Sequence, residues 1–116
     1  MNRGDIVLVQ VPFVGTRGAK LRPALIVQCD PLNGIIRETI IAAITSNLSN
    51  VHQPHQLLID LSTADGAASG LLSDSAIRCE RLHTVPQTDV QRIIGKLSDA
   101  LMAKIDECLK AALGIV

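Results

Sequence analysis

Residues 20–28 read Lys-Leu-Arg-Pro-Ala-Leu-Ile-Val-Gln, a basic pair followed by an apolar run. The partly β-branched run over 22–29 predicts a buried strand. Pro23 has no N–H to donate, so it belongs at the start of that strand or on a sheet edge. Proline also restricts the residue before it, which aims Arg22 out of the sheet edge. A rigidly held guanidinium suits phosphate recognition, although an ordinary surface arginine at a strand start fits the same pattern.

Four further segments predict strands by their alternation or by their buried character, namely 5–11, 38–45, 56–60 and 75–82. The polar or glycine-rich stretches 12–21, 46–54 and 62–70 predict loops, and 30–34 predicts a turn. The last of the strands alternates Ile77 and Cys79 with Arg78, Glu80 and Arg81, which indicates one solvated face.

The C-terminal third predicts one helix. Ser98 is a good N-cap, apolar residues follow at helical spacing from Leu101 to Ala112, and Gly114 ends the pattern. Thr88 and Gln91 fit a capping box, but Gly95 interrupts any long helix there, so we expect 92–97 to be a short extended or turn segment. The fold class is therefore α+β and mostly β, a small curled antiparallel sheet with a terminal helix in one domain, 1–116.

Composition narrows the function. Lys and Arg number 11, Asp and Glu number 11, and the single aromatic residue is Phe13. The balanced charges exclude a nucleic-acid binder held by a global basic field. The single aromatic residue excludes a platform of aromatic side chains on which bases stack. Residues 1–22, however, hold four basic residues against one acid, a net charge of +3 that indicates a local anion site. An odd cysteine count without CxxC, and no apolar run long enough for a leader or a membrane span, predict a cytoplasmic protein.

A second candidate site is Thr45-Ser46-Asn47, where two hydroxyls and an amide end a buried strand. Such groups can donate to a phosphoryl oxygen, although turn chemistry explains them equally well. His52 and His55 form HxxH, but Pro54 prevents helical presentation and no third metal ligand lies near, so we expect a solvated loop. His83 fits either a general base or a polar strand end.

Taken together and in order, seven stretches resemble the MazF/PemK family of toxins from type II toxin–antitoxin systems. No single stretch is diagnostic, but seven stretches in the right order along nearly the whole chain are a strong signal. The matching stretches are 3–7, 18–28, 44–47, 70–75, 81–85, 94–98 and 111–114.

The resemblance implies an SH3-like (CcdB/PemK-like) barrel with a C-terminal helix, and a homodimer. It also implies a cofactor-free, metal-independent endoribonuclease that cuts single-stranded mRNA at short sequences, leaving 2′,3′-cyclic phosphate and 5′-OH ends. By position, Arg22 matches the catalytic arginine of the family and Thr45 its catalytic threonine, with Ser46 assisting. Substrate contacts are expected from residues around these positions, namely Phe13, Arg17, Lys20, Gln28, Asn47 and Arg78.

The chain departs from the PemK-like branch in one respect. That branch has an Arg and an Asp on the fifth strand and a loop His, whereas this chain has Arg78 and Glu80 and no His in 12–21. The departure favours the Arg/Thr mechanism of the MazF branch. An arginine is a poor base at neutral pH, so the general base stays open. Arg78 either binds phosphate or pairs with Glu80.

Partners follow from the same resemblance. We expect the acidic tail of a cognate antitoxin to dock near Arg17, Lys20 and Arg22 and block RNA, with operator DNA bound only by the toxin–antitoxin complex. Two alternatives stay open. One is a CcdB-like toxin that poisons gyrase through its terminal residues, here the apolar 113–116, and the other is a degenerate module that only binds antitoxin.

Overall fold

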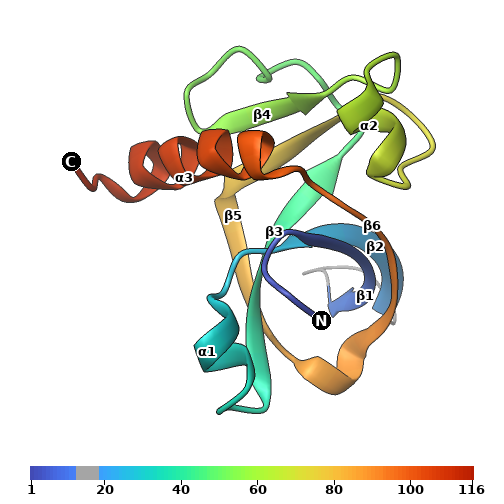
Figure 1. Ribbon diagram of the computed structural model, residues 1–116, viewed down its shortest axis with the longest axis vertical. Helices are drawn as coiled ribbons and strands as arrows, with labels where there is room; N and C mark the ends of the chain where they lie inside the picture. The colour runs from blue at the N-terminus through green and yellow to red at the C-terminus, as the bar shows by residue number, and fades with distance from the viewer. Residues whose placement is uncertain (13–18) are drawn as a thin grey trace.

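The computed structural model describes residues 1–12 and 19–116, and its elements form one six-stranded antiparallel sheet with a long C-terminal helix (Figure 1). The strand order is β4-β5-β3-β2-β1-β6, and the outer strands β4 and β6 do not pair with each other. The predicted α+β class is therefore confirmed, with the sheet curled but not closed. The strands are β1 (Asp5–Pro12), β2 (Ala19–Ile26), β3 (Glu38–Thr45), β4 (Gln56–Ile59), β5 (Ser75–Pro86) and β6 (Val90–Lys96).

Strand β2 begins earlier than its sequence predicts, at Ala19, so Pro23 lies in mid-strand. Pro23 pairs with Leu8 of β1, while pairing with β3 starts only at Ala24. Pro23 therefore sits where β2 is locally an edge on one side, which is where a residue without an N–H is tolerated.

Of the two expectations for 92–97, a short extended segment or a turn, the extended one is correct, because residues 92–96 belong to a sixth strand, although the sequence predicts no sixth strand. The capping box at Thr88 does not form, since a short 3-10 helix, η1 (Gln87–Asp89), leads directly into β6. Gly95 is accommodated in β6 because the strand passes very close to a neighbouring backbone. A Cβ built there would lie 2.3 Å from the carbonyl carbon of Ser69.

Two predicted irregular segments contain short helices, α1 (Asp30–Asn33) and α2 (Ala64–Ala68). Strand β5 also runs four residues beyond its predicted end at Leu82. It is bent by a bulge, because Ala42 of β3 pairs with Leu82 while the next residue, Ala43, pairs with Arg78. The bulge lets one long strand follow the curl of the sheet.

The terminal helix α3 (Asp99–Leu113) packs across β4 and β5 (Figure 1). Its predicted ends are confirmed: Ser98 Oγ accepts a hydrogen bond from the Leu101 N–H at 3.2 Å, and Gly114 has a left-handed φ of 71°. Ile105 and Cys108 are its buried residues. No helix in the described part of the chain is long and apolar enough to cross a membrane.

The core consists of two clusters. One lies between the sheet and α3 and includes Ile77, Cys79 and Cys108, and the other is formed inside the curl by residues such as Val9 and Ile41. Burial, followed by the nearby Cys108, raises the pKa of the Cys79 thiol to about 12, so it stays a thiol at neutral pH. Cys79 and Cys108 thus act as small buried apolar residues, whereas Cys29 is exposed.

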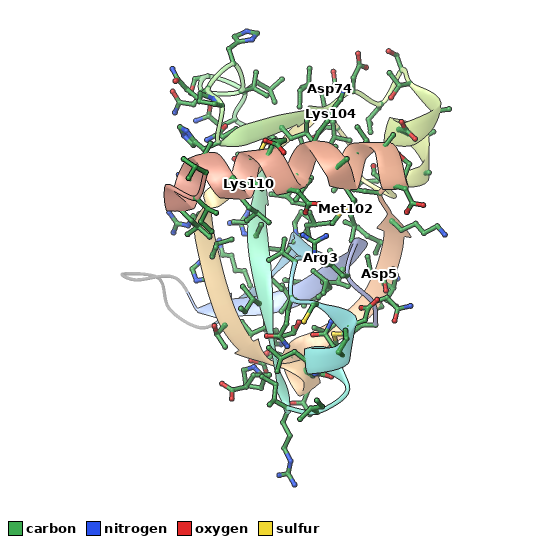
Figure 2. The ribbon with its side chains drawn as sticks, turned by 60° about the vertical axis from the view of Figure 1, so that its left-hand side comes forward. Arg3, Asp5, Asp74, Met102, Lys104 and Lys110 are labelled. Atoms are coloured by element: carbon green, nitrogen blue, oxygen red, sulfur yellow. The ribbon has the colours of Figure 1, made fainter. Side chains whose placement is uncertain are left out.

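Arg3 is part of the basic segment 1–22, but its side chain binds other parts of the fold and does not face the candidate site. Its Nη2 lies 2.6 Å from Asp106 Oδ1 of α3, and its Nε donates to the Val27 carbonyl oxygen at 2.8 Å. Figure 2 shows Arg3 on the side of the sheet that α3 covers. The local anion site predicted from the charge of 1–22 therefore does not include this residue.

Candidate functional site

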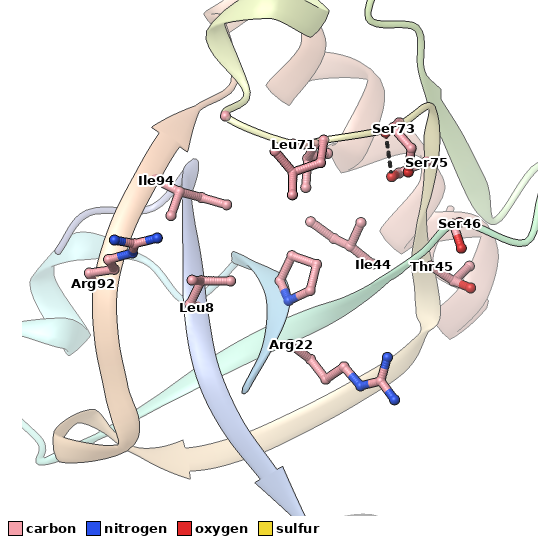
Figure 3. Close-up of a pocket in the computed structure, with 13 residues that line it drawn as sticks. Leu8, Arg22, Ile44, Thr45, Ser46, Leu71, Ser73, Ser75, Arg92 and Ile94 are labelled. Atoms are coloured by element: carbon pink, nitrogen blue, oxygen red, sulfur yellow. Dashed lines mark hydrogen bonds between the residues drawn. The ribbon is translucent and has the colours of Figure 1, made fainter. Parts of the chain in front are cut away.

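A cavity of about 350 Å³, the larger of two that Arg22 lines, opens where β2 and β3 meet the loop before β5. Arg22 reaches it from β2, and Thr45 and Ser46 reach it from the end of β3 (Figure 3). Separate local patterns predict Arg22 and Thr45, and the adjacent placement of β2 and β3 brings them to one site. The remaining wall consists mainly of aliphatic side chains, with Ser73, Ser75 and Arg92.

A second cavity of about 270 Å³ adjoins the first, and both are lined by Arg22 and Thr45. Its other polar lining comes from β5, namely Arg78, Arg81 and His83. No acidic side chain of the described residues lines either cavity. The two cavities together therefore form a cationic surface with Arg22 and Thr45 at its centre, and this surface suits an extended polyanion.

The turn after β3 is organised by its own polar groups. The Asn47 N–H donates to Thr45 Oγ1 at 3.1 Å, and the Ser49 N–H donates to Asn47 Oδ1 at 3.0 Å. The Thr45 hydroxyl thus accepts one backbone hydrogen bond and can direct its own O–H to a ligand. Asn47 lines a small third cavity of about 110 Å³ together with Thr45 and Arg78.

Arg78 and Glu80 form an ion pair. Arg78 Nε lies 3.1 Å from Glu80 Oε2, and Gln56 Nε2 donates to the same oxygen at 3.2 Å. Burial would raise the pKa of Glu80, but hydrogen bonds from its own backbone, from Arg78 and from Gln56 hold that pKa below its usual value. Of the two roles left open for Arg78, the pairing is present, and Arg78 lines the second cavity as well.

His83 is the one histidine among the described residues that lines a cavity shared with Arg22. Burial, and secondarily Arg81, lowers the pKa of its imidazole, so the ring is neutral at neutral pH. Its Nε2 is buried and has no hydrogen-bond partner within the described structure. His52 and His55 lie in the loop between β3 and β4, and the described residues contain no group of three metal-ligating side chains.

The lowered pKa of His83 predicts an acid-sensitive stability. The unfolded chain takes up a proton near the usual pKa of 6.5, whereas folded His83 stays neutral to a lower pH. The free energy of unfolding should therefore fall as the pH drops through about 6.5 and level off below the folded pKa. Urea unfolding on both sides of this pH should show a smaller loss in His83→Gln than in the wild type. Equal losses of unfolding free energy in the two proteins would contradict the role of His83. Glu80 and Asp60 also have lowered pKa values, but as carboxylates they change stability only at more acidic pH.

The other predicted substrate contacts are dispersed. Gln28 is 5 % exposed, and its amide nitrogen donates to Asn33 Oδ1 and to the Glu38 carbonyl oxygen, so the structure places it in the support of α1 and not at the cavities. Lys20 lies exposed on β2 and lines none of the cavities described above. Phe13 and Arg17 lie outside the described residues.

Sequence reasoning misses three residues that line the larger cavity, Arg92, Ser73 and Ser75. Arg92 lies in the segment expected to be short extended or turn structure, and only its place on β6 beside β1 brings it to the site. Ser75 Oγ donates to the Ser73 carbonyl oxygen at 2.9 Å, which fixes the end of the loop (Figure 3). The stretch 70–75 contributes to the family resemblance, but nothing local indicates which cavity it faces.

The fold and sequence have known counterparts. The chain is 30 % identical over 117 residues to the endoribonuclease EndoA of Bacillus subtilis, covering 100 % of this chain and 97 % of that protein. A mycobacterial endoribonuclease solved in complex with its cognate antitoxin superposes with a TM-score of 0.79 at 19 % identity, over 100 % of this chain and 97 % of that one. A chain of the MazE–MazF crystal structure from Deinococcus radiodurans gives a TM-score of 0.76 at 14 % identity, over 100 % of this chain and 98 % of that one.

These comparisons first define a class, the MazF-type endoribonucleases of toxin–antitoxin systems. The family model described as "PemK-like, MazF-like toxin of type II toxin-antitoxin system" then matches residues 2–113. The chain therefore belongs to this toxin family, and the family resemblance stated from sequence is confirmed.

Proposed function

We propose that this toxin cleaves single-stranded mRNA without a metal ion, at short sequences, by attack of a ribose 2′-OH on the adjacent phosphorus. The P–O5′ bond breaks, leaving a 2′,3′-cyclic phosphate and a 5′-OH. The observation that carries the proposal is the meeting of Arg22 with the Thr45 and Ser46 hydroxyls in one cavity, from two strands of the sheet. Side chains of this kind fit a phosphate whose negative charge grows during the reaction.

Each of these residues has a role that its chemistry allows. Arg22 stabilises the charge on the phosphorane oxygens and can supply a proton to the leaving 5′ oxygen, while Thr45 donates a hydrogen bond beside it and Ser46 assists. A guanidinium is a poor proton acceptor, so the base that takes the 2′-OH proton is a separate group. Further contacts to the RNA come from Lys20, Asn47 and Arg78, and from Phe13 and Arg17, which precede β2 in the sequence.

The test is cleavage of a long, unstructured RNA by the purified toxin in excess EDTA. The products should accept a 5′ label from polynucleotide kinase without prior phosphatase treatment, because their 5′ ends carry hydroxyls. Their 3′ ends should resist periodate until the cyclic phosphate is removed. Cleavage that stops in EDTA, or 5′-phosphate products, would overturn the proposal.

The proposal includes two partners in the cytoplasm. A mean hydropathy of +0.33 and exposed apolar side chains such as Ile35 and Ile93 favour a homodimer. The cationic surface around Arg22 favours the acidic tail of a cognate antitoxin, as the relative solved with its antitoxin suggests. Light scattering should give about twice the chain mass, and added antitoxin should stop cleavage stoichiometrically. A monomer, or cleavage unaffected by antitoxin, would count against the respective partner.

A further inference from the structure

The larger cavity extends well beyond the residues that act on the phosphate. From Arg22 and Thr45 it continues over an aliphatic floor to Arg92 on β6, and Leu8, Ile94 and Leu71 lie between the two ends (Figure 3). None of these aliphatic residues has a role in the cleavage chemistry. The apolar part of the cavity therefore calls for a ligand group that is not phosphate.

Its size and lining match a nucleobase. A volume of about 350 Å³ lies at the small end of ligand sites, which run from about 300 to 1,000 Å³. Aliphatic walls accept the flat face of a base, and the polar groups at the rim can read its edge. Because Arg22 and Thr45 line the same cavity, a base held there belongs to a nucleotide next to the cleaved phosphate.

Arg92 determines which base fits best. It is exposed on β6 beside Leu8, and no hydrogen bond or ion pair joins its side chain to another described residue. A guanidinium has donors only, in a planar fork that matches the two acceptors O6 and N7 of guanine. Adenine and cytosine present an amino donor on the corresponding edge, and uracil presents a single acceptor.

We propose that this cavity binds the base of a nucleotide flanking the cleaved phosphate, and that Arg92 makes guanine the preferred base there. The inference rests on the proposed function, which gives the position of the cleaved phosphate. It extends that function by naming the base that the same site prefers. The second cavity, with Arg78, Arg81 and His83, has the charge to hold neighbouring phosphates and does not compete for this role.

The first experiment maps cleavage positions. Sequencing of 5′-OH ends from a transcript pool cut by the wild type should show guanine enriched at one position beside the cut. Arg92→Gln, which is shorter and uncharged and lacks the guanidinium fork, should reduce that preference by roughly five- to 150-fold. Arg37→Gln is the matched control, because Arg37 is exposed before the opposite end of β3, outside all the cavities described above. An unchanged guanine preference in Arg92→Gln, or none in the wild type, overturns the inference.

The second experiment separates this inference from the proposed function. Short 2′-O-methyl oligouridylates carrying one guanine, adenine or cytosine cannot be cut, and their binding is measured by fluorescence anisotropy. Tighter binding of the guanine oligonucleotide by the wild type, lost in Arg92→Gln and kept in Arg37→Gln, supports the inference even if no RNA is cleaved. Equal affinity for all the oligonucleotides overturns it even if cleavage proceeds as proposed.

Discussion

Replacing Arg22 by alanine is expected to lower the single-turnover rate of RNA cleavage by about 10²–10³-fold, the cost typical of removing one preorganised donor from a site of developing charge. The loss should fall mainly on kcat, because the guanidinium interacts most strongly when the phosphorane carries its extra charge. Among the described residues, Arg22 is the one arginine that lines both the larger and the second cavity together with Thr45.

Two companion variants make the result specific. Arg22→Lys keeps the positive charge but loses the planar fork, so we expect it to recover only part of the rate. Arg37→Ala removes the same side chain from an exposed position outside the cavities and should cleave normally. If Arg22→Ala unfolds like the wild type in urea and still cleaves at the full rate, Arg22 is not the catalytic arginine.

The elements that sequence predicts well are those specified by local pattern. Strand β3 occupies Glu38–Thr45, the predicted residues. A short, continuous run of β-branched and apolar residues is typical of a buried strand, so this element is readily recognised from sequence. The ends of α3 are equally local, since the Ser98 hydroxyl and the left-handed Gly114 each act within one turn. Strand β6 escapes prediction because Gly95 weakens its pattern, and its pairing with β1 spans most of the chain.

The same distinction holds for the site. Arg22 and the Thr45–Ser46 pair carry signals at or near the ends of their own predicted strands, so local pattern makes them candidates and the family resemblance selects them. Arg92 and Ser73 become relevant only because the sheet places β6 beside β1 and the loop before β5 over the same cavity. No local pattern contains that information. Residues that set specificity are therefore harder to predict here than residues proposed for the chemistry.

The second large effect is expected at Gly70, which joins α2 to the loop over the larger cavity. Gly70 has a φ of 75°, and a Cβ built on it would lie 2.0 Å from the Ile94 carbonyl oxygen. Ile94 is the additional residue of a bulge in β6, where Ile6 pairs with Gly95 and Val7 pairs with Ile93, so it cannot withdraw without disturbing the pairing with β1. Gly70→Ala therefore meets both an unfavourable φ and a backbone clash.

The glycine at the end of α3 separates these two costs. Gly114 has nearly the same φ, 71°, but nothing lies within 4 Å of a Cβ built there. Gly114→Ala should thus lose only about 1–2 kcal/mol for the left-handed conformation, while Gly70→Ala adds about 1–3 kcal/mol for overpacking. Urea unfolding of both variants measures the difference directly. Equal losses of unfolding free energy would mean that the segment after α2 moves away from β6 without cost. The contact between Gly70 and Ile94 would then not hold the cavity wall that includes Leu71 and Ser73 in place.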